Sequence, residues 1–214
     1  MKRFFATVFI AAFAHAVCAN GLESLASFVK TVSSGRADFT QVVTAPAKEG
    51  QAARSKTSSG TFEFSRPNRF KFLYKKPFEQ SIVADGQTLW LYDADLNQVT
   101  ARKQSAALGS TPAALIAAAP DLRALQADFT LAAAPEKDGL EWVEATPKAK
   151  DGQLQAVRVG FRAGEKPAGL AALEILDSFG QRSVLSFSRV EVNPALPKDT
   201  FQFITPKGAD VIRQ

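Results

Sequence analysis

The chain has 214 residues, of which 46% are hydrophobic, and it carries a formal net charge of +5. This length is enough for one domain with a sizeable core, and no linker or repeat divides the sequence. The 26 basic and 21 acidic residues are spread along the chain, whereas a nucleic-acid-binding domain gathers its basic residues in a patch. We therefore expect a single domain that does not bind nucleic acid.

The first residues have the pattern of a secretory signal peptide. Two basic residues precede an apolar run from Phe4 to about Ala14, and small residues follow where a signal peptidase cleaves. The run is too short to span a membrane as a helix. We predict a signal peptide at residues 1–19, cleaved near Ala19, and an exported mature domain at residues 20–214.

Cys18 raises the alternative of a lipid anchor attached to that residue. A lipoprotein signal requires an aliphatic residue three positions before the cysteine and a small residue just before it, but His15 and Val17 occupy these positions. The only methionine, histidine and cysteine of the chain all lie in the predicted signal peptide. The mature protein would then lack an imidazole for acid–base chemistry and a Cys or His ligand for zinc. We expect no metal, no cofactor and no enzymatic activity.

The mature chain is predicted to begin with an amphipathic helix. Apolar residues recur at helical spacing from Leu22 to Val32, and Ser33-Ser34-Gly35 ends the pattern. Arg36–Thr44 then alternates as a strand, with Phe39 on one face. Ala45–Ser59 has no large apolar residue, which predicts a mobile hairpin loop.

The segment Gly60–Thr100 has the pattern of five short strands separated by turns. Asp85-Gly86 predicts a two-residue hairpin, because a type I′ turn needs positive φ at both central positions. A period of two places alternate side chains on opposite faces of a sheet. The aromatic residues that share one face in this pattern are Phe62, Phe64, Phe70, Phe72 and Tyr74.

The second half of the chain predicts one short helix and further strands. Thr111-Pro112 supplies a cap and a first-turn proline, Ala113–Ala119 fills the helix, and Pro120 ends it. A dozen antiparallel strands in one domain should curve towards a barrel. The two apolar helices would cover its concave aromatic side, either as a lid over a cavity or as part of a packed core. The later strands are predicted at Ala127–Ala132, Leu140–Thr146, Leu154–Arg162, Leu170–Asp177, Arg182–Val192 and Phe201–Ile204.

The whole mature chain resembles the outer-membrane lipoprotein carrier protein family (LolA). The resemblance implies a mainly β fold with helices: an incomplete antiparallel β-barrel of about 11–12 strands with a helical lid over an apolar cavity. The segments that carry it include Phe39-Thr40-Gln41, Phe64-x-Arg66-Pro67-x-x-Phe70, Asp85-Gly86-x-x-Leu89-Trp90, Thr111-Pro112, Asp177-x-x-Gly180-Gln181 and Phe201-x-Phe203-x-x-Pro206-x-Gly208.

The resemblance also implies a function. Members of this family are chaperones that take acylated lipoproteins from an inner-membrane ABC transporter and pass them to an outer-membrane receptor lipoprotein. We expect the same partners for this chain, acting as a monomer. Two alternatives are a receptor or a sensor of lipoproteins with the same fold, the receptor being disfavoured by the residues before Cys18. A hydrolase would need converging carboxylates in a cleft, and the sequence shows no such group.

Site residues follow from the same resemblance. Arg66 matches the family arginine that holds the lid closed through the lid-helix backbone, here around Ile116 and Ala117. Phe72 stands where many members have tryptophan, which affects only the fit of the cargo. Trp90 could belong to the core or to the cavity wall. The residues expected to line the acyl cavity are Phe39, Phe62, Phe64, Phe70, Phe72, Trp90 and Leu115.

Overall fold

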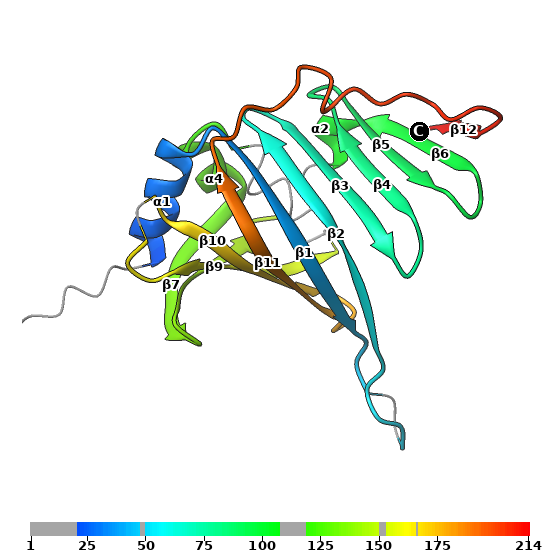
Figure 1. The fold of residues 1–214 in the computed structure, drawn as a ribbon. Helices are drawn as coiled ribbons and strands as arrows, with labels where there is room; N and C mark the ends of the chain where they lie inside the picture. Colours follow the sequence, from blue (N-terminus) through cyan, green and yellow to red (C-terminus); the bar gives the residue numbers. More distant parts are fainter. Residues whose placement is uncertain (1–20, 48–49, 108–118, 150–152, 166) are drawn as a thin grey trace, which may run out of the picture.

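The computed structural model describes residues 21–47, 50–107, 119–149, 153–165 and 167–214 (Figure 1). Its helices are α1 (Gly21–Thr31), α2 (Gln104–Ala107) and α4 (Leu122–Asp128). Its strands are β1 (Ser34–Thr44), β2 (Ser55–Ser65), β3 (Arg69–Lys76), β4 (Gln80–Ala84), β5 (Thr88–Asp93), β6 (Gln98–Lys103), β7 (Phe129–Lys137), β8 (Leu140–Pro147), β9 (Leu154–Arg162), β10 (Gly169–Asp177), β11 (Arg182–Val192) and β12 (Asp210–Arg213).

The strands form one curved sheet in the order β12-β6-β5-β4-β3-β2-β1-β11-β10-β9-β8-β7. Neighbouring strands pair antiparallel from β6 to β7, and β11 joins the two halves by pairing with β1. The outermost strands β7 and β12 are not paired with each other, so the sheet stays open. The predicted incomplete barrel of about a dozen strands is therefore confirmed.

The end of the chain differs from the prediction of a strand at Phe201–Ile204. That segment is not a strand; it crosses the convex face of the sheet, where the Phe203 ring stacks on Trp90 with centroids 5.0 Å apart. The last strand is instead β12, which pairs parallel with β6. The alternating Phe-x-Phe pattern resembles a strand, but here its side chains pack onto an existing sheet and its backbone does not join an edge.

Two further boundaries differ from the sequence analysis. The predicted loop Ala45–Ser59 is shorter, because β2 begins at Ser55 and pairs there with Thr44 of β1. The strand predicted from Ala127 begins at Phe129, because its first two residues belong to α4, which the Asp121 side chain caps by accepting a bond from the Ala124 N–H at 2.9 Å. The predicted signal peptide lies outside the described residues. The helix predicted at Ala113–Ala119 also lies outside them, except for Ala119.

Helix α1 is fixed to the β7–β9 part of the sheet (Figure 1). Its apolar stripe faces inward and includes Phe28 and Val29, both buried. At its first residue, Gly21, a Cβ atom would collide with the Trp142 carbonyl of β8. One turn later the Ser24 hydroxyl bonds the buried Glu141 carboxylate, also on β8. The start of the helix is thus anchored on one strand.

Within the described part of the chain, no helix combines the length and apolarity that spanning a membrane requires.

The opposite end of α1 is held by Asn193, which follows β11. Its Oδ1 accepts from the Ser33 N–H at 2.7 Å, and its Nδ2 donates to the Thr31 carbonyl at 3.0 Å. Asn193 has a φ of 53°, in the left-handed region that asparagine tolerates better than most residues. One side chain therefore satisfies the last turn of α1 and the first residues of the strand that follows it.

Replacing Asn193 by alanine should destabilise the fold by about 2 kcal/mol, since its side-chain hydrogen bonds are lost and alanine is strained at positive φ. Asn193→Gly removes the bonds without the strain and should cost about 1 kcal/mol. Urea denaturation followed by circular dichroism measures both values. Equal stability of the wild type and the alanine variant would contradict this role for Asn193.

Candidate apolar binding site

Aromatic side chains from four adjacent strands form the concave side of the sheet. The Phe62 ring of β2 stacks on Phe72 of β3 with centroids 4.4 Å apart, and Phe39 of β1 meets Phe72 edge-on at 5.4 Å. The predicted sharing of one face by these aromatic residues is confirmed. The members of this cluster, each no more than 5% exposed, are Phe39, Phe62, Phe64, Phe70, Phe72 and Phe187.

Helices α1 and α4 cover this face together with the other half of the sheet. Phe28 of α1 lies 6.0 Å from Phe64 and 5.6 Å from Phe161 of β9, measured between ring centroids. Leu125 of α4 packs into the same core. The aliphatic residues that complete it from β8 and β9 are Val143, Ala145, Val157 and Val159.

The interior is apolar, as expected, and the described residues that line it pack closely together. The described residues leave two small apolar voids there, each of about 10 Å³. One void lies between α1, α4 and the β8–β9 strands, and the other lies between α1 and strands β1, β2 and β11. Each has room for about one water molecule. Neither of these two voids could hold a long acyl chain unless the residues around it moved.

Trp90 does not join the aromatic cluster. Its neighbour Leu89 occupies the concave position and is 4% exposed, whereas Trp90 lies on the convex face against Phe203. Its indole N–H also bonds the Asp85 carboxylate at 3.0 Å. Alternation showed that Leu89 and Trp90 face opposite ways but could not tell which face was concave. Three more predicted site residues, Leu115, Ile116 and Ala117, lie outside the described residues.

Arg66 links two parts of the chain that cover the interior. It follows β2 directly, and its Nε donates to the Val32 carbonyl, just after α1, at 2.9 Å. Its Nη1 donates to the Ala119 carbonyl, on the approach to α4, at 2.6 Å. The guanidinium carbon also lies within 5.6 Å of the ring centroids of Phe28 and Phe64. Arg66 thus bonds the backbone of Ala119, whereas Ile116 and Ala117, the partners implied by the resemblance, lie outside the described residues.

The burial of Arg66 carries a desolvation cost that its hydrogen bonds and ring contacts have to offset. Burial lowers the pKa of Arg66 to about 10, so the side chain is still charged at neutral pH. Its Nη2 is buried and has no hydrogen-bond partner among the described residues. Two charge-assisted bonds and two aromatic faces therefore offset the desolvation of one cation whose hydrogen-bonding capacity is not fully used.

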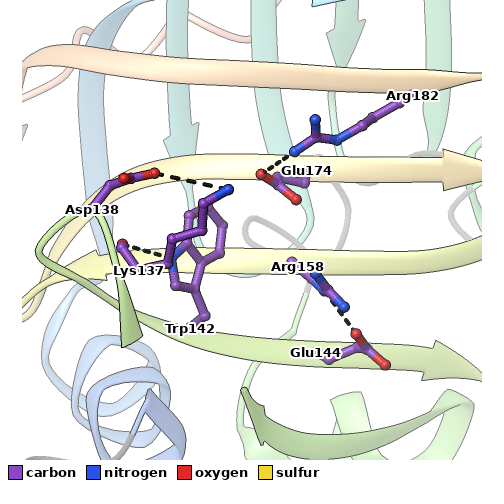
Figure 2. Close-up of polar contacts among 7 residues, drawn as sticks. All are labelled: Lys137, Asp138, Trp142, Glu144, Arg158, Glu174 and Arg182. Atoms are coloured by element: carbon purple, nitrogen blue, oxygen red, sulfur yellow. Dashed lines mark hydrogen bonds and ion pairs between the residues drawn. The ribbon is translucent and has the colours of Figure 1, made fainter. Parts of the chain in front are cut away.

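The convex face of the sheet is polar by contrast (Figure 2). On β8–β11, Arg158 pairs with Glu144 at 2.7 Å and Arg182 pairs with Glu174 at 2.6 Å. These side chains border a groove of about 400 Å³, but their charges are paired with each other. Trp142 lies on this face too, with its indole N–H bonded to the Lys137 carbonyl at 3.1 Å, so it is buried outside the main core.

Other polar candidates have structural explanations. Asp93 accepts a bond from the Leu96 N–H at 3.1 Å and so shapes the β5–β6 turn. The Arg69 guanidinium lies over the Phe201 ring at 5.6 Å, where it helps to hold the C-terminal segment. In the described ranges, no group of three or more His, Cys, Asp or Glu residues could hold a metal ion. The apolar concave face remains the strongest candidate site.

Phe62→Ala should destabilise the protein by about 3–5 kcal/mol, because it removes a fully buried ring from the centre of the aromatic cluster. Phe78→Ala is the matched control, since that ring is 67% exposed in the turn after β3 and should change stability by less than about 0.5 kcal/mol. Chemical denaturation compares the two variants with the wild type. Similar losses in both would mean that the concave cluster is not the stabilising core.

Comparison with known proteins agrees with this geometry. The family model described as "Outer membrane lipoprotein carrier protein LolA" matches residues 30–204. Proteins named outer-membrane lipoprotein carrier protein from Albidiferax ferrireducens and Leptothrix cholodnii are 81% and 54% identical to this chain. The matches cover 99% and 92% of this chain and 100% and 87% of those proteins.

A solved structure of an uncharacterised conserved protein from Thermus thermophilus shares the fold. Its TM-score is 0.50 at 14% sequence identity, over 90% of this chain and 98% of that one. At that identity the likeness concerns the fold alone, whereas the two curated relatives are similar along nearly the whole sequence. The chain therefore belongs to the outer-membrane lipoprotein carrier protein family.

Proposed function

We propose that this protein is a periplasmic chaperone that carries acylated lipoproteins to the outer membrane. The observation that carries the proposal is the phenylalanine-rich concave face of an open sheet, covered by helices and not by a second sheet. The relatives' shared name indicates the cargo. An inner-membrane ABC transporter would supply the lipoproteins, and a receptor lipoprotein in the outer membrane would accept them.

The physics of acyl chains explains why a carrier is needed. Burial of an acyl chain in a bilayer is worth about 0.8 kcal/mol per methylene, so one long chain resists leaving the membrane by roughly 10 kcal/mol. A lipoprotein with several chains would not cross an aqueous compartment unaided. A carrier has to offer a comparable apolar surface and still release its cargo without ATP. A covering that competes with the cargo for that surface meets both requirements.

We assign the role of this covering to helices α1 and α4. In the conformation described, α1 and α4 pack on the concave face, and the two voids beside them are too small for an acyl chain. Cargo would displace this covering, and its return as cargo leaves would bury the same apolar area again. The carrier would then alternate between two states of similar free energy, and its ligand would shift their populations.

Arg66 is the residue that we assign to the closed state. Its two bonds to the Val32 and Ala119 carbonyls hold the end of α1 and the approach to α4 together, and they exist only when these segments are side by side. The return of the covering after release regains these bonds. Arg66 therefore favours hand-over of the cargo more than its uptake.

A release assay tests the carrier proposal. The exported protein is mixed with inner-membrane vesicles that hold an acylated lipoprotein and an energised transporter, and the soluble fraction is analysed. We expect a soluble one-to-one complex with the acylated lipoprotein. A variant of the same lipoprotein without its acylated cysteine is the control and should form no complex. Absence of any complex with the acylated form would overturn the proposal.

Arg66→Leu should keep the fold and the uptake of cargo but impair delivery to outer-membrane vesicles. Loss of two charge-assisted bonds weakens the closed state by about 1.5–3 kcal/mol, which corresponds to a roughly tenfold to hundredfold fall in its population relative to the open state. The matched control is Arg54→Leu, because Arg54 is exposed beside β2. Delivery at the wild-type rate by the Arg66 variant would exclude the assigned role.

A further inference from the structure

Three polar side chains cross the apolar concave face in a hydrogen-bonded chain. Tyr74 of β3 donates from its hydroxyl to Gln41 Oε1 at 2.9 Å, and Gln41 Nε2 of β1 donates to Ser183 Oγ of β11 at 2.7 Å. Their neighbours on this face are aromatic or aliphatic, among them Phe39, Phe72 and Leu185. A polar chain in such a place calls for an explanation, because burial of polar groups is costly unless they are bonded.

The sheet register shows how the three side chains meet. Tyr74 is opposite Gly60 of β2, which is in turn opposite Phe39 of β1. Since Gly60 has no side chain, the Tyr74 ring can pass over β2, and it meets the Phe39 ring edge-on at 5.0 Å. On the other side, Ser183 is opposite Val43, so Gln41 reaches it diagonally across the β1–β11 pair.

The position of the chain is a boundary within the concave face. Along β1 the inward-facing residues change from buried Phe39 to half-buried Gln41 and Val43. Along β3 they change from buried Phe72 to half-buried Tyr74. The three polar groups thus lie where the closed aromatic interior gives way to the more exposed end of the face. A ligand with apolar tails and a polar end would place its junction at such a boundary.

The three side chains carry donor hydrogens that the bonds between them do not use. The tyrosine hydroxyl, the glutamine amide and the serine hydroxyl carry four donor hydrogens between them, and the two bonds use two. Two donor hydrogens remain unused in either orientation of the Gln41 amide group. No described residue accepts either of them. Burial raises the pKa of Tyr74 to about 12, so its hydroxyl keeps its proton at neutral pH.

We propose that Tyr74, Gln41 and Ser183 form a subsite that binds the carbonyl oxygens joining acyl chains to the polar end of a multiply acylated ligand. This inference rests on the proposed function and assigns a chemical specificity to the same face. Ester carbonyls are acceptors that carry no hydrogen, which suits the two free donors. The acyl tails would then lie against the phenylalanine cluster, and the polar end of the ligand would leave through the exposed end of the face.

The subsite predicts a preference for ester linkages that apolar burial alone does not give. The probes are a synthetic diacylglyceryl-cysteine peptide with ester-linked chains and its ether-linked counterpart of equal chain length. Their affinities are measured by displacement of a fluorescent fatty-acyl probe from the wild-type protein. We expect the ester form to bind about fivefold to tenfold more tightly, since one or two neutral hydrogen bonds distinguish the two ligands.

Conservative variants test which side chains cause the preference for ester linkages. Tyr74→Phe and Ser183→Ala each remove one hydroxyl without adding volume and should lower the ester-to-ether ratio towards one, as should Gln41→Leu. Two controls should leave the ratio unchanged. Tyr92→Phe removes a hydroxyl that bonds Asn97 at 3.2 Å from the convex face, and Ser186→Ala removes an exposed hydroxyl on β11.

The outcomes separate this inference from the proposed function. Equal binding of both peptides by the wild type would overturn the subsite and leave the acyl-binding face in place. Weaker binding of both peptides by the variants with an unchanged ratio would assign the polar chain a purely structural role and overturn the subsite as well. Failure of the wild type to bind either peptide would overturn both proposals together.

Discussion

A curved sheet that does not close on itself leaves one apolar face without a partner sheet, and the rest of this structure depends on how that face is covered. The edges β7 and β12 stay apart, and the phenylalanine cluster faces inward. Its burial is worth roughly 25 cal/mol for each Å² of apolar surface, whatever apolar group provides the cover. Helices α1 and α4 provide it here, and acyl chains would be equally suitable on the same physical grounds. In the proposed carrier, closure and cargo binding would therefore be alternatives on one surface.

Arg66 adds direction to this otherwise non-directional burial. Apolar packing does not fix which part of a helix lies where, whereas bonds from one guanidinium to the Val32 and Ala119 carbonyls do. Since the charge is desolvated and its Nη2 has no partner among the described residues, its net contribution is smaller than its bonds suggest. In the carrier that we propose, such a contact would specify the closed arrangement without making it too stable to open.

The alternation of apolar and polar residues was enough to predict the features that depend on residues close together in the sequence. Alternation placed Phe62, Phe64, Phe70 and Phe72 on one face because each strand lies next to the following one. It was insufficient where the partner is distant in sequence. Trp90 lies on the convex face because Phe203 covers it there, and the parallel pairing of β12 with β6 depends on the path of the whole C-terminal segment. The Tyr74–Gln41–Ser183 chain likewise needs the register of β1, β2, β3 and β11 together.

The two sides of the Arg66 contact are not equally fixed. On the α1 side, the helix is anchored at its start by Gly21 and Ser24 against β8 and at its end by Asn193. None of these contacts involves Arg66, so α1 keeps its attachments to the sheet when the Arg66 bonds break. On the other side, Ala119 precedes α4, whose contacts with the sheet are made mainly to β7, an edge strand. Loss of the Arg66 bonds should therefore affect Ala119 and α4 before α1, so in the proposed carrier α4 would leave the concave face more readily than α1.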